Sequence, residues 1–201
     1  MKVRLSSLAE VQCLEKDHTI ETCDNLGDAF VQKLLKKYSG DKYDILYVVF
    51  DRYDIENSLK SSTRKRRQGG KEPTAYRISN NMKITNISMK KLLSHVSTKH
   101  ELSCFFAEKI TEYCKLKNIP VVVAYSDKCD STFKDVHHLW NNHEEADTKM
   151  LLCAKDATVS GASRIEIHSP DSDVFIIALR RYPELCEETY FVTGKGADSK
   201  V

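Results

Sequence analysis

The apolar residues of this chain follow two spacings that alternate along its length. Steps of three and four residues predict helices at 24–38, 88–96, 99–117, 144–157 and 174–179. Continuous or alternating apolar runs rich in β-branched and aromatic residues predict strands at 43–51, 119–125, 164–168 and 188–193. Helices that alternate with strands favour an α/β fold, with a mostly parallel central sheet and helices on both faces.

The sequence marks the ends of some of these elements more clearly than those of others. Asp24 or Asn25 is the expected N-cap of the helix at 24–38, and Gly40 follows its last turn. The helix at 174–179 is apolar throughout, which predicts that it is buried. Residues 1–22 are poorly defined, and Val3, Leu5 and the apolar residues after them fit an amphipathic segment.

Length and composition narrow the class of protein. The chain has 201 residues, 41% of them hydrophobic and 30% charged, which fits one globular domain spanning 1–201. No apolar run approaches the roughly 20 residues that cross a membrane. Seven cysteines form no close pair, so we expect reduced thiols and an intracellular protein of the nucleus or cytoplasm.

Carboxylates follow two of the expected strands directly. Asp51 ends the run at 43–51, and Asp171 and Asp173 come just after the strand at 164–168. Open α/β sheets keep their ligand sites at the carboxyl ends of their strands. Carboxylates that gather there repel one another unless a cation lies among them, and Mg²⁺ or Mn²⁺ prefers oxygen ligands. We therefore expect a shared site for one or two such ions.

Another acidic group stands at the start of the helix at 144–157. Glu145 and Asp147 lie in or next to its first turn, where the helix dipole favours negative charge. A capped helix explains these residues without a ligand. The start of this helix could also add ligands to the metal site at the two strand ends. Glu145 and Asp147 would then bind the metal together with Asp51, Asp171 and Asp173.

A basic segment at 58–75 follows the strand that ends in Asp51. It carries Lys60 and Arg67 among other cations, and Gly69, Gly70 and Pro73 are expected to make it mobile. Such a run is commonly a solvated patch. Its position after a candidate metal ligand also suits contact with phosphates, so nucleic acid, DNA or RNA, is the expected partner.

Val48-Val49-Phe50-Asp51, Glu145-Ala146-Asp147 and Ser169-Pro170-Asp171-Ser172-Asp173 together resemble the PIN-like nucleases, in particular the flap endonuclease and Asteroid-type branch. The resemblance covers roughly residues 43–179. It implies a three-layer fold, a metal bound by the five acids, and cleavage of phosphodiester bonds in structured or single-stranded nucleic acid. It also implies that Lys60 and Arg67, seven residues apart, contact the scissile phosphate.

The chain departs from that family at both ends. The resemblance implies an aspartate in a first strand before residue 24 and another beyond the last motif, past Val201, as in a longer gene product; Asp17 is a poor match for the first. A catalytically inactive scaffold that binds nucleic acid or protein is therefore the main alternative.

Two other hypotheses, a phosphatase and a zinc site, agree less well with the sequence. The position of Asp171-x-Asp173 late in the chain argues against a haloacid-dehalogenase-like phosphatase, which has this pair after its first strand. The spacing of His137, His138 and His143 matches no standard zinc motif.

Overall fold

The computed structural model describes residues 1–7, 19–38, 42–55 and 73–193. Within these ranges a sheet of six strands has the order β4-β3-β2-β1-β5-β6. All neighbouring strands are parallel except β4, which runs antiparallel to β3. The strands are β1 Lys2–Ser7, β2 Ile45–Val49, β3 Val121–Tyr125, β4 Lys128–Ser131, β5 Arg164–His168 and β6 Glu188–Val192.

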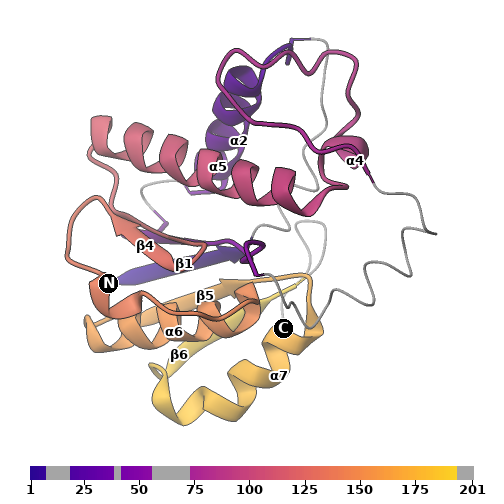
Figure 1. Ribbon diagram of the computed structural model, residues 1–201. Helices are drawn as coiled ribbons and strands as arrows, with labels where there is room; N and C mark the ends of the chain where they lie inside the picture. The colour runs from indigo at the N-terminus through magenta and orange to yellow at the C-terminus, as the bar shows by residue number, and fades with distance from the viewer. Residues whose placement is uncertain (8–18, 39–41, 56–72, 194–201) are drawn as a thin grey trace.

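Helices cover both faces of this sheet (Figure 1). One face packs against α2 (Cys23–Lys37) and α5 (Val96–Leu116), and the core there includes Phe30, Phe50 and Phe106. The other face packs against α6 (Ala146–Val159) and α7 (Ser172–Arg181). The remaining elements are α4 (Met89–Leu92) and the 3₁₀ turns η1 (His137–Leu139) and η2 (Tyr182–Glu184). The predicted α/β class with helices on both faces is confirmed.

The amphipathic segment expected near the N-terminus is wrong for its first residues, which form the strand β1 between β2 and β5. Val3 and Leu5 join the core under α6. Arg4 and Ser6 face the other way and are nevertheless buried, with the Arg4 Nε donating to Ser6 Oγ at 3.1 Å. The polar residues on one face of β1 are buried, so the hydrophobic pattern of the sequence did not predict a strand here.

Several element boundaries also differ from expectation. The N-cap of α2 is Thr22, because its Oγ1 accepts from the Asn25 backbone N–H while the Asn25 side chain accepts from the Thr22 N–H. The helix expected at 88–96 is the single turn α4, and α5 begins at Val96. Residues 126–130, expected as a turn, include the start of β4.

The prediction that the apolar helix after Asp173 is buried is wrong. Only Val174 and Ala178 of α7 are buried, whereas Ile176 and Leu179 are 60% and 61% exposed. No helix of the described residues is long and apolar enough to span a bilayer.

Candidate metal centre

The candidate site lies at the carboxyl edge of the parallel strands. From β1 the chain proceeds outward through β2 to β3, whereas the later strands β5 and β6 lie on the opposite side of β1. This change of direction next to β1 is the topological switch point at which α/β proteins bind ligands. Asp51 follows β2 and Asp171 follows β5, so the two aspartates flank the end of β1.

Three of the five predicted acids come together at this edge. Asp147, Asp171 and Asp173 each offer a carboxylate oxygen that lies within 4.8 Å of those of the other two. Asp147 is half-buried, and Asp171 and Asp173 are exposed. The part of the chain that the structure describes places neither Asp51 nor Glu145 in this group, which we call the acidic triad.

Two helix N-termini hold the acidic triad in place. Asp171 is the N-cap of α7, and its Oδ1 accepts from the Asp173 backbone N–H at 2.9 Å. The backbone N–H of Asp171 donates to Oγ of the buried Ser169 at 3.1 Å. Asp147 lies in the first turn of α6. Both helix dipoles therefore favour negative charge at this point, and three oxygen donors so close together also suit a hard divalent cation.

Asp51 fastens the end of β2 to the start of α6. Its Oδ1 accepts from the Ala146 backbone N–H at 2.8 Å, and its Oδ2 accepts from the Tyr53 hydroxyl at 3.1 Å. The backbone N–H of Arg52 adds a bond to the Glu144 carbonyl at 2.8 Å. Glu145, the N-cap residue of α6, makes no side-chain capping bond of its own, so Asp51 supplies the acceptor from another part of the chain.

Asp51 is therefore expected to stabilise the start of α6. Replacing Asp51 by alanine should lower the free energy of unfolding by about 1 kcal/mol, whereas Asp51→Asn should cost less because its amide oxygen can still accept from Ala146. Urea denaturation of both variants measures the difference. Equal losses for the two substitutions would contradict a capping role and point to the charge of Asp51 instead.

A buried lysine that was not predicted as a site residue lies on the inner side of α6. Lys149 of α6 is 1% exposed, and its Nζ donates to the Ser126 carbonyl at 2.5 Å, at the turn after β3. Burial lowers the pKa of Lys149 to about 8, and the charge of Asp51 partly offsets this effect. Its position among Ala146, Met150 and Cys153 on the buried side of α6 was the signal available in the sequence.

Among the described residues, no other predicted group joins the acidic triad. Lys60 and Arg67, together with Asp17, lie outside the described residues. β1 ends in Ser6 and Ser7, and the residues that follow this strand lie outside the described ranges. His138 lies elsewhere, with its Nε2 2.7 Å from Oδ1 of Asp156, and Nδ1 of His143 is buried without a hydrogen-bond partner.

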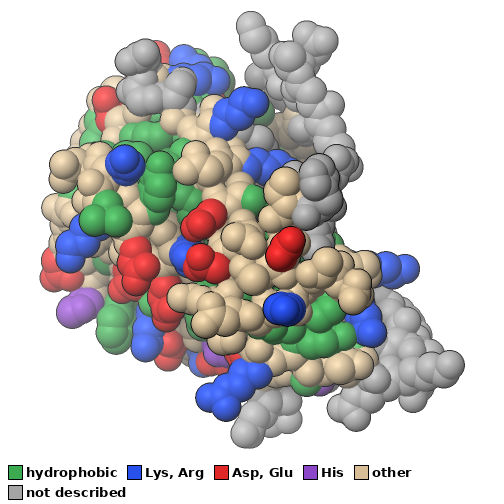
Figure 2. Space-filling view, turned by 90° about the horizontal axis from the view of Figure 1, so that it is seen from above, with side chains coloured by type: hydrophobic (Ala, Val, Ile, Leu, Met, Phe, Trp, Pro, Cys, Tyr) green, Lys and Arg blue, Asp and Glu red, His purple; other side chains and the backbone are tan. Residues whose placement is uncertain are grey.

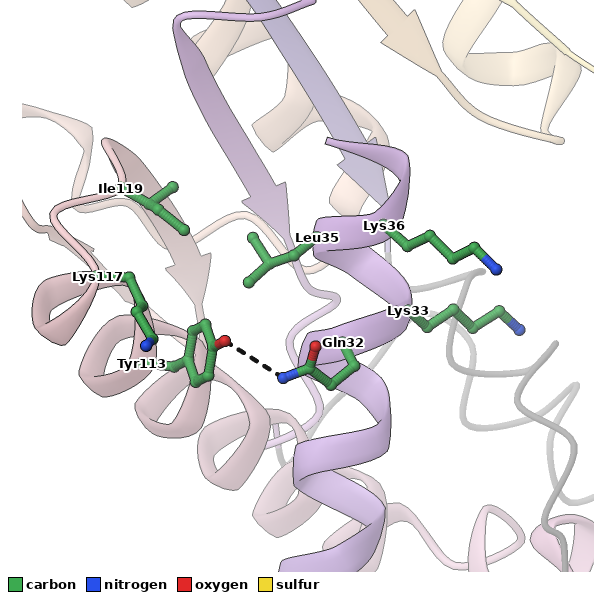
Figure 3. A pocket seen from close by; sticks show the side chains of 7 residues that line it. All are labelled: Gln32, Lys33, Leu35, Lys36, Tyr113, Lys117 and Ile119. Carbon is green, nitrogen blue, oxygen red and sulfur yellow. Dashed lines mark hydrogen bonds between the residues drawn. The ribbon is translucent and has the colours of Figure 1, made fainter. Parts of the chain in front are cut away.

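The surface offers two further features. Acidic side chains gather on the face seen in Figure 2. An open hollow of about 660 Å³ between α2 and α5 is lined by Gln32, Lys33, Leu35, Lys36, Tyr113, Lys117 and Ile119. Lys33 and Lys36 extend away from Tyr113 in Figure 3, and none of the described residues that line the hollow carries a carboxylate, so the hollow does not include the acidic triad.

Comparison of the chain with protein-family models, curated proteins and solved structures gives no match.

Proposed function

We propose that this protein binds Mg²⁺ or Mn²⁺ at the acidic triad and is a PIN-like domain that hydrolyses phosphodiester bonds of nucleic acid. The observation that carries the proposal is the convergence of Asp147, Asp171 and Asp173 within 4.8 Å at the carboxyl edge of a mostly parallel sheet. Residues from two helices, 24 positions or more apart in sequence, meet at the switch point of the sheet.

Each part of the chain has a distinct role in this proposal. A bound ion would supply Lewis acidity and an activated water for attack on phosphorus. The acidic triad would hold the ion, and Asp51 and Glu145 border the triad through the start of α6. Lys60 and Arg67 of the basic segment would bind the phosphate and offset its developing negative charge.

Metal binding is tested with Asp171→Asn. The asparagine keeps a side-chain oxygen that can cap α7 through the Asp173 N–H, so the helix should stay intact while one negative ligand is lost. We expect Mn²⁺ affinity, measured from the free Mn²⁺ signal in electron paramagnetic resonance, to fall by about tenfold or more. Metal-dependent cleavage of labelled single-stranded and flapped DNA and RNA should fall with it.

The matched control is Asp127→Asn. Asp127 follows β3 at the same edge of the sheet, is exposed, and does not belong to the acidic triad. Its substitution should leave both Mn²⁺ affinity and cleavage unchanged. Wild-type protein that shows no Mn²⁺ binding, or equal binding by Asp171→Asn, would overturn the metal site.

A catalytically inactive scaffold of the same fold is the second candidate, and one observation favours it. Asp51, a metal ligand according to the family resemblance, is engaged with the start of α6 and does not belong to the acidic triad. Nucleic-acid binding without any Mn²⁺-dependent cleavage by the wild-type protein would decide for this candidate.

A further inference from the structure

The helix α7 presents apolar side chains to solvent. Ile176 and Leu179 are 60% and 61% exposed, and Phe175 and Tyr182 beside them are 38% and 44% exposed. Their spacing of three and four residues places them along one side of the helix. Exposed apolar stripes of this kind mark sites of association on soluble proteins.

Opposite charges lie at the two ends of this stripe. Asp173 stands in the first turn of α7 and Arg180 in its last turn, and both are exposed. The two residues are seven positions apart, close to two helical turns, so they project from the same flank of the stripe. The neighbouring Arg181 is already paired with Glu184, through Nη1 and Oε1 at 2.6 Å.

We propose that α7 docks against α7 of a second copy of this chain, in antiparallel orientation about a two-fold axis near Ile176 and Leu179. A two-fold interface brings the same surface of both copies together, so the apolar stripe covers itself. In antiparallel helices equivalent flanks meet, which places Asp173 of each copy beside Arg180 of the other. The helix dipoles also oppose each other in this arrangement.

In a parallel arrangement opposite flanks of the stripe meet, so Asp173 of one copy would not pair with Arg180 of the other. One short helix buries little area for a stable complex, so the dimer is expected to be weak and concentration-dependent. The apolar stripe is separate from the proposed metal site, but Asp173 belongs to both the acidic triad and the charge pair, so a bound ion would compete with Arg180 for this carboxylate.

Analytical ultracentrifugation in EDTA tests the dimer without any contribution from bound metal. Leu179→Glu should weaken self-association by about tenfold or more, because it places a charge in the centre of the stripe. Leu116→Glu is the matched control, since Leu116 is 82% exposed on α5, and it should leave association unchanged. Circular dichroism confirms that each variant is folded.

The charge pairing has its own test. Arg180→Glu should weaken the dimer, and the double variant Asp173→Arg with Arg180→Glu should restore it, because each reversed pair regains opposite charges. Wild-type protein that stays monomeric up to its solubility limit would overturn the proposal. Association that Leu179→Glu leaves unchanged, or that the double variant fails to restore, would overturn the antiparallel α7 interface.

Discussion

Replacing Asp156 by alanine is expected to lower the free energy of unfolding by about 3–5 kcal/mol, since it breaks a buried charged network. The Asp156 side chain is 6% exposed. Its Oδ2 accepts from the Tyr47 hydroxyl at 2.7 Å and from Lys134 Nζ at 2.6 Å, and His138 Nε2 lies 2.7 Å from Oδ1. Alanine would leave the Tyr47 hydroxyl buried without this acceptor and would remove the contacts of Lys134 and His138 with Asp156, while Lys134 keeps its bond to Ser160 Oγ.

Urea denaturation at neutral pH measures this loss. Asp135→Ala is the control, because the Asp135 side chain is 81% exposed and its substitution should change stability by only about 0.5 kcal/mol. If Asp156→Ala lowers the free energy of unfolding no more than Asp135→Ala does, the network does not stabilise the fold as proposed.

The same network predicts a pH dependence. Burial alone would raise the pKa of Asp156, but hydrogen bonds from Lys134, Tyr47 and His138 outweigh it and hold the pKa below the usual value of 3.8. A carboxyl with a depressed folded pKa stabilises the protein above its unfolded pKa, and this contribution is lost as pH falls through the folded pKa. The stability difference between wild type and Asp156→Ala should therefore shrink below pH 3.8.

Replacing Lys149 by methionine is expected to raise the free energy of unfolding by about 1–2 kcal/mol at pH 7. Burial lowers the pKa of Lys149 from 10.5 to about 8, which corresponds to a penalty of about 3 kcal/mol for the charged form. Losing the bond to the Ser126 carbonyl offsets part of the gain. Methionine fills a similar space without a charge.

The advantage of methionine should depend on pH in a defined way. Below pH 8 Lys149 is charged in both the folded and the unfolded chain, so the full penalty applies. Between pH 8 and 10.5 the unfolded chain binds more protons at this site, so wild-type stability rises relative to Lys149→Met. Thermal or urea unfolding at pH 7, 9 and 10.5 follows this trend. A substitution that destabilises the protein at all three would show that the bond to Ser126 outweighs the burial of charge.

Much of the fold could be predicted because burial and apolar spacing agree in most elements. The strand β3 is a continuous apolar run, and α2 places Phe30 and Leu34 on one side, so both follow from the sequence pattern. The pattern failed where tertiary contacts override it. Arg4 and Ser6 of β1 are buried although they are polar, and α7 has exposed apolar residues. Hydrophobicity along a chain indicates whether a side chain favours burial. It does not show which neighbouring side chains cover that residue in the fold.

The candidate site, like the fold, could be predicted only in part from the sequence. The strand end before Asp171 and Asp173 and the acidic first turn that contains Asp147 indicated a shared site, and these three carboxylates lie close together. The role of Asp51 could not be foreseen, because it depends on a backbone N–H that lies 95 residues further along the chain. Lys149 was missed for a similar reason, since only the packing of α6 shows that a lysine on its inner side reaches Ser126.

The position of β1 has a consequence for how the chain is made. β1 pairs with β2 on one side, but its other neighbour, β5, is Arg164–His168, and the Met1 amino group donates to Ser163 Oγ at 3.0 Å, 162 residues away. A ribosome that adds about 5–20 residues per second would release β5 about 8–30 seconds after β1. Throughout that interval the nascent protein carries an uncovered strand edge, the kind of surface that invites pairing with other chains. Its yield in cells should depend on chaperones or on the speed of translation.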